Sequence, residues 1–305
     1  MLDRSQLTIF ILLGTAVIVT TGLSLLMGYA GQVSLGQGSF YAVGAYTAGL
    51  MAVHGLPTLL GLAAAPVLAA ALAALVGVPL LRLRGHYLAF ATLAVQLILL
   101  SLVGQFEFTG GDIGLRGIPQ LGVGDATLID PLAYAYVTLA AAALVLLVTR
   151  NLIKSRPGRG LRALASTEVA AESAGVPVGR YKLAVFSLSA AYAGLAGGIY
   201  AFYLGYISPG SFPVLLSVQF VVMAVVGGLG TVWGPVVGAT LITLLVQALN
   251  SLGTMPGMPA YAPDVLSYAV YALLLILVLL FMPRGLLPSI GSRLEDRRAI
   301  SPTRS

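Results

Sequence analysis

Long uncharged apolar runs alternate along this chain with short segments that hold nearly all of its charge. A membrane-spanning helix needs about 20 consecutive apolar residues. Runs that approach this length without a Lys, Arg, Asp or Glu lie at 6–28, 38–54, 58–81, 87–106, 131–149, 183–206, 211–227, 232–250 and 265–282. The pattern predicts an all-α polytopic membrane protein with about nine transmembrane helices, within a range of eight to ten.

Two of these runs have an alternative interpretation. The run at 38–54 is short and contains several polar and small residues, such as Ser39 and Thr47. A broken or re-entrant segment near 36–54 is therefore the alternative to a full crossing, and the bilayer tolerates such a segment only when protein buries it. The first run follows Arg4 as a signal peptide would, but it is too long for a signal core and no clean cleavage site follows. We expect it to be a membrane helix.

The charged segments between the runs predict the orientation. Segments rich in Lys and Arg stay on the cytoplasmic side of a membrane. Segments of this kind lie at 82–86, at 150–182, which holds seven of the sixteen basic residues, and after 283. By contrast, 107–130 contains four acidic residues and one arginine, and Asp264 marks a second external connection. Nine alternating crossings satisfy all of these assignments, with the N-terminus outside and the C-terminus in the cytoplasm.

Composition supports a membrane protein and excludes several other classes. The chain is 58% hydrophobic and 9% charged, with a mean hydropathy of +0.98, whereas soluble domains carry about 25% charged residues. The basic residues behind its net charge of +6 cluster in short loops beside apolar runs, as membrane topology requires. The charge therefore does not predict a nucleic-acid partner. With no cysteine and only two distant histidines, His54 and His86, no metal or cofactor is expected. We predict one transmembrane domain at 1–290 and a disordered cytoplasmic tail at 291–305.

Motifs for catalysis are absent from the sequence. No G-x-x-x-x-G-K-[ST] occurs, and the only lysines, Lys154 and Lys182, do not follow a glycine. There is also no G-x-S-x-G, no H-E-x-x-H and no pair of carboxylates within a span. We therefore expect a protein that is not an enzyme. The spans contain no charged side chain of the kind that proton-coupled carriers use, although a sodium site of carbonyl and hydroxyl oxygens stays open.

The basic segment at 150–182 is predicted to contain a short capped helix near 167–174. Ser166 is the expected N-cap, Glu168 lies in the first turn, and Gly175 suits the position after the helix. An apolar stripe recurs at helical spacing in residues Leu161, Leu164, Ala165 and Val169. The segment either lies on anionic lipid or docks into a separate motor protein. Its small, alanine-rich surface favours docking, since insertion into lipid requires large apolar residues.

Polar and glycine positions within the spans give weaker signals. Polar side chains that either face a pathway or bond a neighbouring helix are Gln96, Ser101, Ser187, Ser189, Gln219 and Gln247. Gly194-x-x-x-Gly198 and Gly234-x-x-x-Gly238 are spacings typical of close helix packing. Leu35-Gly36 and Gly44-Ala45 also have the spacing of Leu229-Gly230 and Gly238-Ala239. This similarity suggests an internal repeat, as transporters often contain, but four common residues leave chance resemblance open.

Several motifs together resemble the permeases of branched-chain amino-acid ABC transporters, and the M-type subunit more than its H-type partner. The segments that carry the resemblance are GYAGQVSLG at 28–36 with Phe40 and Gly44–Tyr46, RLRGHYLA at 82–89, TGGD at 109–112, and a series from Ser155 through Gly158-Arg159, Glu168, Gly175 and Ala193–Gly197 to GGLGT at 227–231 and Gly234-Pro235. One common form of the family has an acidic residue at the position of His86. The resemblance covers residues 28 to about 240.

The resemblance implies a multi-pass subunit of the bacterial inner membrane in a heteromeric importer. Its implied partners are a second, H-type permease, two ABC ATPase subunits and an external solute-binding protein. ATPase-coupling positions carried over from the family are Arg159, Glu168, Ala170, Ala171 and Gly175, in a coupling helix near 157–175. Candidates for lining or packing the translocation path are Gln32, Ser34, Gly36, Gly44, Gln96, Gln219, Gly228 and Gly230. Alternatives are a related importer for urea, short amides or other amino acids, and a stand-alone secondary carrier.

Overall fold

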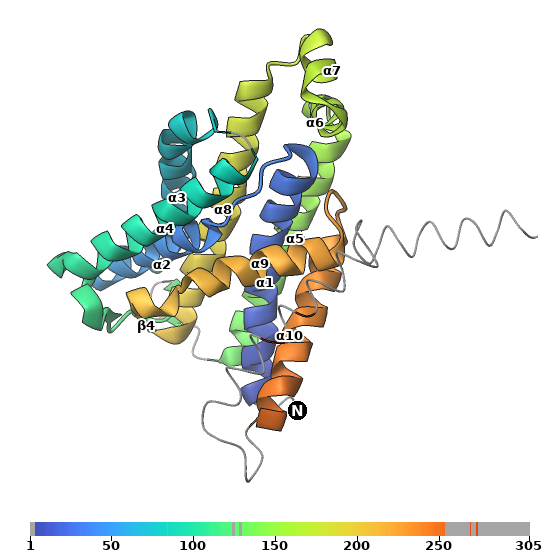
Figure 1. Ribbon diagram of the computed structural model, residues 1–305. Coiled ribbons are helices and arrows are strands. Elements are labelled where there is room, and N and C mark those ends of the chain that lie inside the picture. Colours follow the sequence, from blue (N-terminus) through green and yellow to red (C-terminus); the bar gives the residue numbers. More distant parts are fainter. Residues whose placement is uncertain are drawn as a thin grey trace, which may run out of the picture.

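A computed structural model describes residues 4–83, 85–123, 126–127 and 130–253, together with Ala269 and Leu273. The membrane helices in this part follow the predicted runs in order. They are α1 (Arg4–Tyr29), α2 (Gln37–Val53), α3 (Thr58–Leu80), α4 (His86–Gln105), α5 (Pro131–Lys154), α8 (Val178–Leu204), α9 (Val214–Gly227) and α10 (Gly234–Gly253). The predicted all-α membrane architecture is confirmed (Figure 1).

Six helical segments in the described part are long and apolar enough to cross a membrane by length and composition. The predicted ninth span at 265–282, Asp264 and the tail at 291–305 lie outside the described residues. The number of nine crossings and the position of the C-terminus therefore stay predictions.

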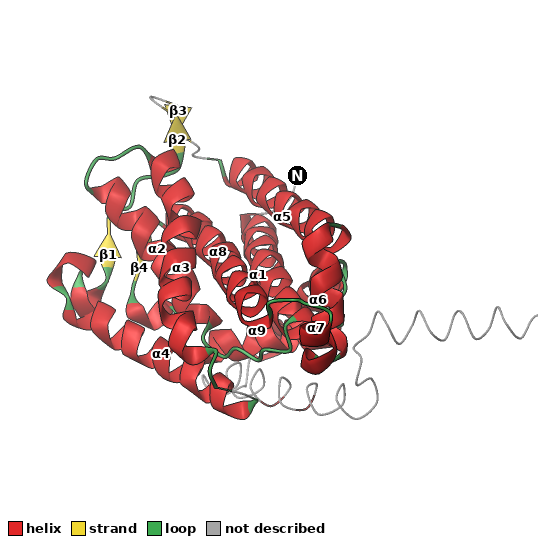
Figure 2. Ribbon diagram, turned by 90° about the horizontal axis from the view of Figure 1, so that it is seen from above, coloured by secondary structure: helices red, strands yellow, loops and turns green. Residues whose placement is uncertain are grey.

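Helix α8 occupies the centre of the bundle and packs closely on α2 and α3 (Figure 2). Small residues permit this packing. A Cβ atom at Gly44 of α2 would overlap the backbone of Gly194 in α8, and one at Gly197 would overlap the carbonyl oxygen of Tyr41. In lipid, helices associate through such close backbone contact because apolar burial alone does not favour association there. The packing role predicted for the glycine spacing that begins at Gly194 is confirmed.

The helical structure is interrupted before α2, and α2 itself is continuous. The extended segment 30–36 follows α1, and the helix starts at Gln37 and runs for 17 residues. The Gln37 side chain bonds Ser189, which lies 11 residues into α8, or about 16 Å from its start at 1.5 Å per residue. Helix α2 therefore begins near the middle of the bundle. The interruption lies just before the segment near 36–54, for which a broken or re-entrant form was the alternative to a full crossing, and the glycines of α2 serve packing.

Helix α9 is the second departure from a simple crossing. It has 14 residues, about 21 Å, and only together with the residues that precede it from Pro209 does the segment reach the 19 residues of a candidate span. Figure 1 shows it running across α1, whereas α5 and α10 run along α1. The loop after α9 then packs on the end of α1, because the backbone N–H of Gly230 donates to Ser24 Oγ at 3.2 Å and the Tyr29 hydroxyl donates to the Gly230 carbonyl at 2.9 Å.

The connections gather at opposite ends of α8 (Figure 1). At one end, β1 (Leu115–Arg116) pairs antiparallel with β4 (Tyr206–Ile207). Around this pair lie η1 (Glu107–Thr109), η2 (Gly111–Ile113), η3 (Pro209–Ser211) and the hairpin of β2 (Gly122–Val123) and β3 (Ala126–Thr127). At the other end lie α6 (Arg156–Ser166) and α7 (Glu168–Ser173). This separation agrees with the predicted external and cytoplasmic sides.

Candidate translocation pathway and coupling element

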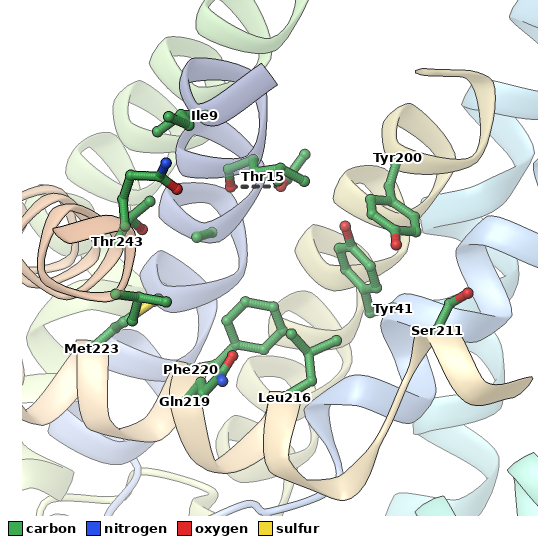
Figure 3. Close-up of a pocket in the computed structure, with 14 residues that line it drawn as sticks. Ile9, Thr15, Tyr41, Tyr200, Ser211, Leu216, Gln219, Phe220, Met223 and Thr243 are labelled. Carbon is green, nitrogen blue, oxygen red and sulfur yellow. Dashed lines mark hydrogen bonds between the residues drawn. The ribbon is translucent and has the colours of Figure 1, made fainter. Parts of the chain in front are cut away.

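A cavity of about 330 Å³ lies between α1, α2, α8, α9 and α10. Figure 3 shows the rings of Tyr41 and Tyr200 on one side of it and Thr243 and Met223 on the other. The residues that line it are Ile9, Leu12, Thr15, Ala16, Tyr41, Tyr200, Ser211, Leu216, Gln219, Phe220, Met223, Thr243, Val246 and Gln247. They come from the ends of α1, α8 and α10 that share a side with β4, so the cavity lies in the half of the bundle on the side that is predicted to be external.

The lining of this cavity combines neutral polar groups with apolar surface. Hydroxyl groups come from threonine, serine and tyrosine, amides come from Gln219 and Gln247, and no lining residue is charged. The rings of Tyr41 and Tyr200 lie 5.4 Å apart between centroids, and the rings of Phe212 and Phe220 also pack on Tyr41. Such a site can bond a neutral or zwitterionic solute through hydroxyl and amide groups. It holds no fixed charge that would select a cation or an anion.

Gln219 and Gln247 are the predicted polar span residues that line the cavity. Gln96 lies elsewhere. It is fully buried, accepts a hydrogen bond from the Ser217 hydroxyl at 2.6 Å, and its amide points at the carbonyl oxygens of Phe212 and Pro213 at 3.4 Å. Ser189 is likewise bonded to Gln37 at 2.9 Å. For these two residues the structure supports the helix-bonding interpretation.

We call the bonded set at the start of α2 the polar brace. It comprises Gln37 with Ser189, and the backbone N–H of Gly38 with Ser217 Oγ (2.7 Å) and Gln96. All four side chains in it are at least 99% buried. The brace joins α2, α4, α8 and α9 at one point. The brace lies at the start of α2, on the side of the cavity that faces away from β4.

Replacing Ser217 by alanine should destabilise the folded protein, because the Gly38 N–H and Gln96 Oε1 then lose a partner in a buried place. Leaving such groups unpaired costs about 1–3 kcal/mol, which should appear as a lower melting temperature of the detergent-purified protein. Ser101→Ala provides the control, since Ser101 is exposed on α4. Equal melting temperatures for the two variants would contradict the role of the brace.

The predicted path candidates before α2 are buried in the 30–36 segment. Gln32 is 4% exposed and Ser34 is fully buried, and Ser34 Oγ accepts a hydrogen bond from the Gly36 N–H at 3.4 Å. A Cβ atom at Gly36 would overlap the carbonyl oxygen of Thr92 in α4, while Thr92 Oγ1 accepts from the Leu35 N–H at 3.0 Å. These residues hold the segment in place and do not line the cavity.

The glycine candidates divide into packing and loop positions. Gly44 packs on α8, as described above, and does not line the cavity. Gly228 and Gly230 have φ angles of +111° and +72°, a backbone region that other residues rarely adopt. They form the loop between α9 and α10, where Gly230 lies against Gly28 of α1. Their part in any pathway stays a prediction.

The basic segment 150–182 contains two short helices, α6 and α7, at the end of the bundle that is predicted to be cytoplasmic. Ser155 caps α6, with its Oγ accepting from the Gly158 N–H at 3.4 Å, and Pro157 stands in the first turn. Leu161 and Leu164 are buried, and Arg162 bonds the Ile153 carbonyl at 2.7 Å. Helix α6 is thereby fixed to the end of α5.

Helix α7 differs in its start from the prediction and agrees in its end. Thr167, not Ser166, is the N-cap, with Oγ1 accepting from the Ala170 N–H at 3.1 Å. Ser166 closes α6, where its hydroxyl bonds the Ala163 carbonyl. At the other end, Gly175 has φ +76°, and the N–H groups of Gly175 and Val176 bond the carbonyls of Glu172 and Ala171. This is the Schellman motif expected of a glycine after a helix.

The break at Thr167 also divides the predicted apolar stripe. Leu161 and Leu164 face the interior, but Ala165 is exposed and Val169 is 73% exposed. The single continuous helix that would align all four residues does not form, because Thr167 is in an extended conformation. Val169 therefore presents an exposed apolar side chain on α7.

The coupling candidates occupy different environments on α6 and α7. Glu168 forms an ion pair with Lys182 of α8. Ala171 is fully buried, whereas Arg159, Ala170 and Gly175 are exposed. Glu168 and Ala171 thus face the protein and position α7, and the other three are accessible to a partner. Contact with an ATPase stays a prediction for all five.

The sequence did not indicate Tyr41, Tyr200 or Thr243 as pathway residues. Each lies on a different helix, and the rings of the two tyrosines meet only after α2 and α8 pack together. A hydroxyl within an apolar run is compatible with any face of its helix. No spacing within one run could have identified this set.

Comparison with known proteins gives consistent matches. The sequence matches the family described as "branched-chain amino acid transport system / permease component" over residues 5–279. The high-affinity branched-chain amino acid transport permease LivM of Escherichia coli is 31% identical over 322 residues, 97% of this chain and 73% of LivM. The ribose import permease RbsC of Escherichia coli is 29% identical over 77% of this chain and 74% of RbsC. The structure of PsaBC from Streptococcus pneumoniae in complex with Fab aligns at a TM-score of 0.49 and 15% identity, covering 93% of this chain and 94% of that one.

Proposed function

Because this chain belongs to the permease family of branched-chain amino acid transport systems, we propose that it forms the membrane pathway of an ABC importer for branched-chain amino acids. It is a multi-pass, non-enzymatic component of the bacterial inner membrane. The observation that supports the proposal is the uncharged cavity. An amino-acid zwitterion has no net charge, so hydroxyl and amide groups can bond its two ends while Leu12, Met223 and Val246 surround an apolar side chain.

Transport by this chain requires partners that supply energy and solute. The proposed assembly includes an H-type permease, two ATPase subunits that hydrolyse ATP, and an external solute-binding protein. We assign the ATPase contact to α6 and α7, whose accessible residues include Arg159, Val169 and Ala170. In this arrangement the C-terminus is cytoplasmic.

A continuous set of contacts links α7 to the cavity. Glu168 holds α7 on α8 through Lys182, and two turns further along α8 Ser189 bonds Gln37. Next to Gln37, Gly38 joins Ser217 and Gln96 in the polar brace. A movement of α7 driven by ATP binding would act on the brace and open the cytoplasmic side of the cavity, as alternating access requires.

Reconstitution tests the proposal directly. The complete assembly in proteoliposomes should accumulate leucine only with ATP and the solute-binding protein. Transport by this chain alone, driven by an ion gradient without nucleotide, would identify a secondary carrier and refute the proposal. The substrate is identified by measuring which solutes the purified solute-binding protein binds. The solutes to compare are branched-chain amino acids, other amino acids, urea and short amides.

Replacing Gln219 by tryptophan should reduce leucine uptake at least tenfold, because the indole fills the cavity beside Phe220 and Met223. Uptake is measured in proteoliposomes of the full assembly. Leu97→Trp is the matched control, since Leu97 is 51% exposed on the outer surface of α4. Normal uptake by the Gln219 variant would place the pathway elsewhere in the chain.

A further inference from the structure

An apolar groove of about 410 Å³ runs along the surface between α1, α5 and the start of α10. We call it the α1–α5 groove. Its walls include Val17, Ala143, Leu147 and Val236, and its only charged lining residue is Arg150. Its floor lies near Gly14, where α1 and α5 meet so closely that a Cβ atom would lie 2.5 Å from Thr138 Cγ2. The pathway cavity lies apart from this groove, with no lining residue in common.

The groove has the length and direction of a lipid chain in one leaflet. Along α5 its lining extends from Leu139 to Arg150, or about 16 Å at 1.5 Å per residue. This is about half of the ~30 Å hydrocarbon core of a bilayer. Arg150 marks the cytoplasmic end, since α5 continues from there to Lys154 and α6. The groove thus opens at the level of the cytoplasmic headgroups and ends near the bilayer centre.

Two residues at the cytoplasmic end suit a phosphate headgroup. Arg150 is exposed and has no hydrogen bond or ion pair within the described residues. Trp233, the only tryptophan of the chain, lines the groove and is 65% exposed. Tryptophan favours the membrane interface, and arginine binds phosphate oxygens with two parallel hydrogen bonds. Lys154, one turn further along α5, adds positive charge, while the acidic residues described at this end, Glu168 and Glu172, lie on α7.

We propose that the α1–α5 groove binds an anionic phospholipid of the cytoplasmic leaflet. The phosphate pairs with Arg150 beside Trp233, and one acyl chain fills the apolar groove down to Gly14. Charge complementarity favours this occupant over a helix of a partner protein, because an apolar helix offers nothing to the unpaired guanidinium. A basic site at the cytoplasmic end of an interhelical groove is the usual form of anionic-lipid recognition.

Native mass spectrometry of the full chain in its purified assembly, titrated with phosphatidylglycerol or phosphatidylcholine, tests the headgroup. We expect phosphatidylglycerol to bind more tightly and Arg150→Gln to weaken its binding about fivefold, since one arginine near an anionic surface contributes ~1 kcal/mol. Arg82→Gln removes the same charge at the same side of the membrane, outside the groove, and should bind normally. Equal affinity for the two lipids, or equal loss in both variants, overturns the proposal.

The acyl-chain part is tested by Ala143→Phe, which fills the groove from an exposed position of α5. This variant should lose the tightly bound phosphatidylglycerol and keep its melting temperature in lipid-free detergent. Ala71→Phe adds the same ring at an exposed position of α3 and should retain the lipid. If the Ala143 variant binds lipid normally, or if a crosslinker at Ala143 reaches the second permease in the assembly, the groove is not a lipid site.

Discussion

Gly44→Val should leave almost no folded protein, because α2 and α8 pack backbone to backbone at this residue. Its Cβ atom would overlap backbone atoms of Gly194 in α8. Backbone cannot move aside as a flexible side chain does, so α2 and α8 would have to separate along their whole contact. Overpacking of this kind costs about 3 kcal/mol or more, a large part of the 5–15 kcal/mol that stabilises a typical protein.

Size-exclusion chromatography of a fluorescent fusion in detergent measures the folded yield of this variant. Gly179→Val is the matched control, because Gly179 lies in the first turn of α8 and a Cβ atom there has open space around it. The control should elute as the unmodified protein does. A monodisperse Gly44 variant with an unchanged melting temperature would show that α2 and α8 do not pack as described.

Glu168→Lys should abolish ATP-driven uptake by the assembled importer while leaving the chain folded. The substitution places two positive charges together, because Lys182 is the partner of Glu168. The pair is partly exposed, with 44% of the Glu168 side chain accessible, so its direct contribution to stability is small. Its larger effect is on position, since α7 would no longer be held on α8. We expect at least a tenfold loss of uptake.

The double variant Glu168→Lys with Lys182→Glu distinguishes a role in positioning from direct contact with an ATPase. It restores the ion pair with reversed charges, and uptake should recover to within a few-fold of the original. Glu172→Lys makes the same charge change at an exposed position of α7 that has no ion pair in the described structure, and should have a smaller effect. Failure of the double variant to recover would mean that Glu168 itself touches the motor.

The positions of the membrane helices were predictable from the sequence because a span depends on the apolar character of about 20 consecutive residues, and single residues change it little. Eight runs match described helices to within a few residues, and the larger differences occur where Lys154 and Arg180 extend the helices past the apolar runs. Helix α2 was harder to predict, since its glycines weaken its hydropathy and at the same time allow its packing. The unwound residues 30–36 precede it because their polar groups bond Thr92 and one another, which sequence spacing does not reveal.

The candidate site was predictable only in part, because contacts between distant segments decide the rest. Gly175 followed from local chemistry, because a glycine before Val176-Pro177 suits the left-handed residue that ends a helix. Ser166 and Thr167 are both good caps, and which one serves depends on whether α6 continues one residue further. Gln96 and Gln219 are alike in sequence, yet one is bonded inside the brace and the other faces the cavity. That difference arises from how four helices meet.

The short β1–β4 pair has a mechanical consequence for α8. It fastens the end of the helix at Leu204 to the connection between α4 and α5, so that end acts as a pivot. Lys182 lies about 33 Å along the helix from Leu204, and Ser189 about 22 Å, at 1.5 Å per residue. As a rigid lever, α8 would deliver about two thirds of any sideways displacement at Lys182 to Ser189. The half of the pathway next to β4 would then stay nearly still, while the half next to α7 would move sideways.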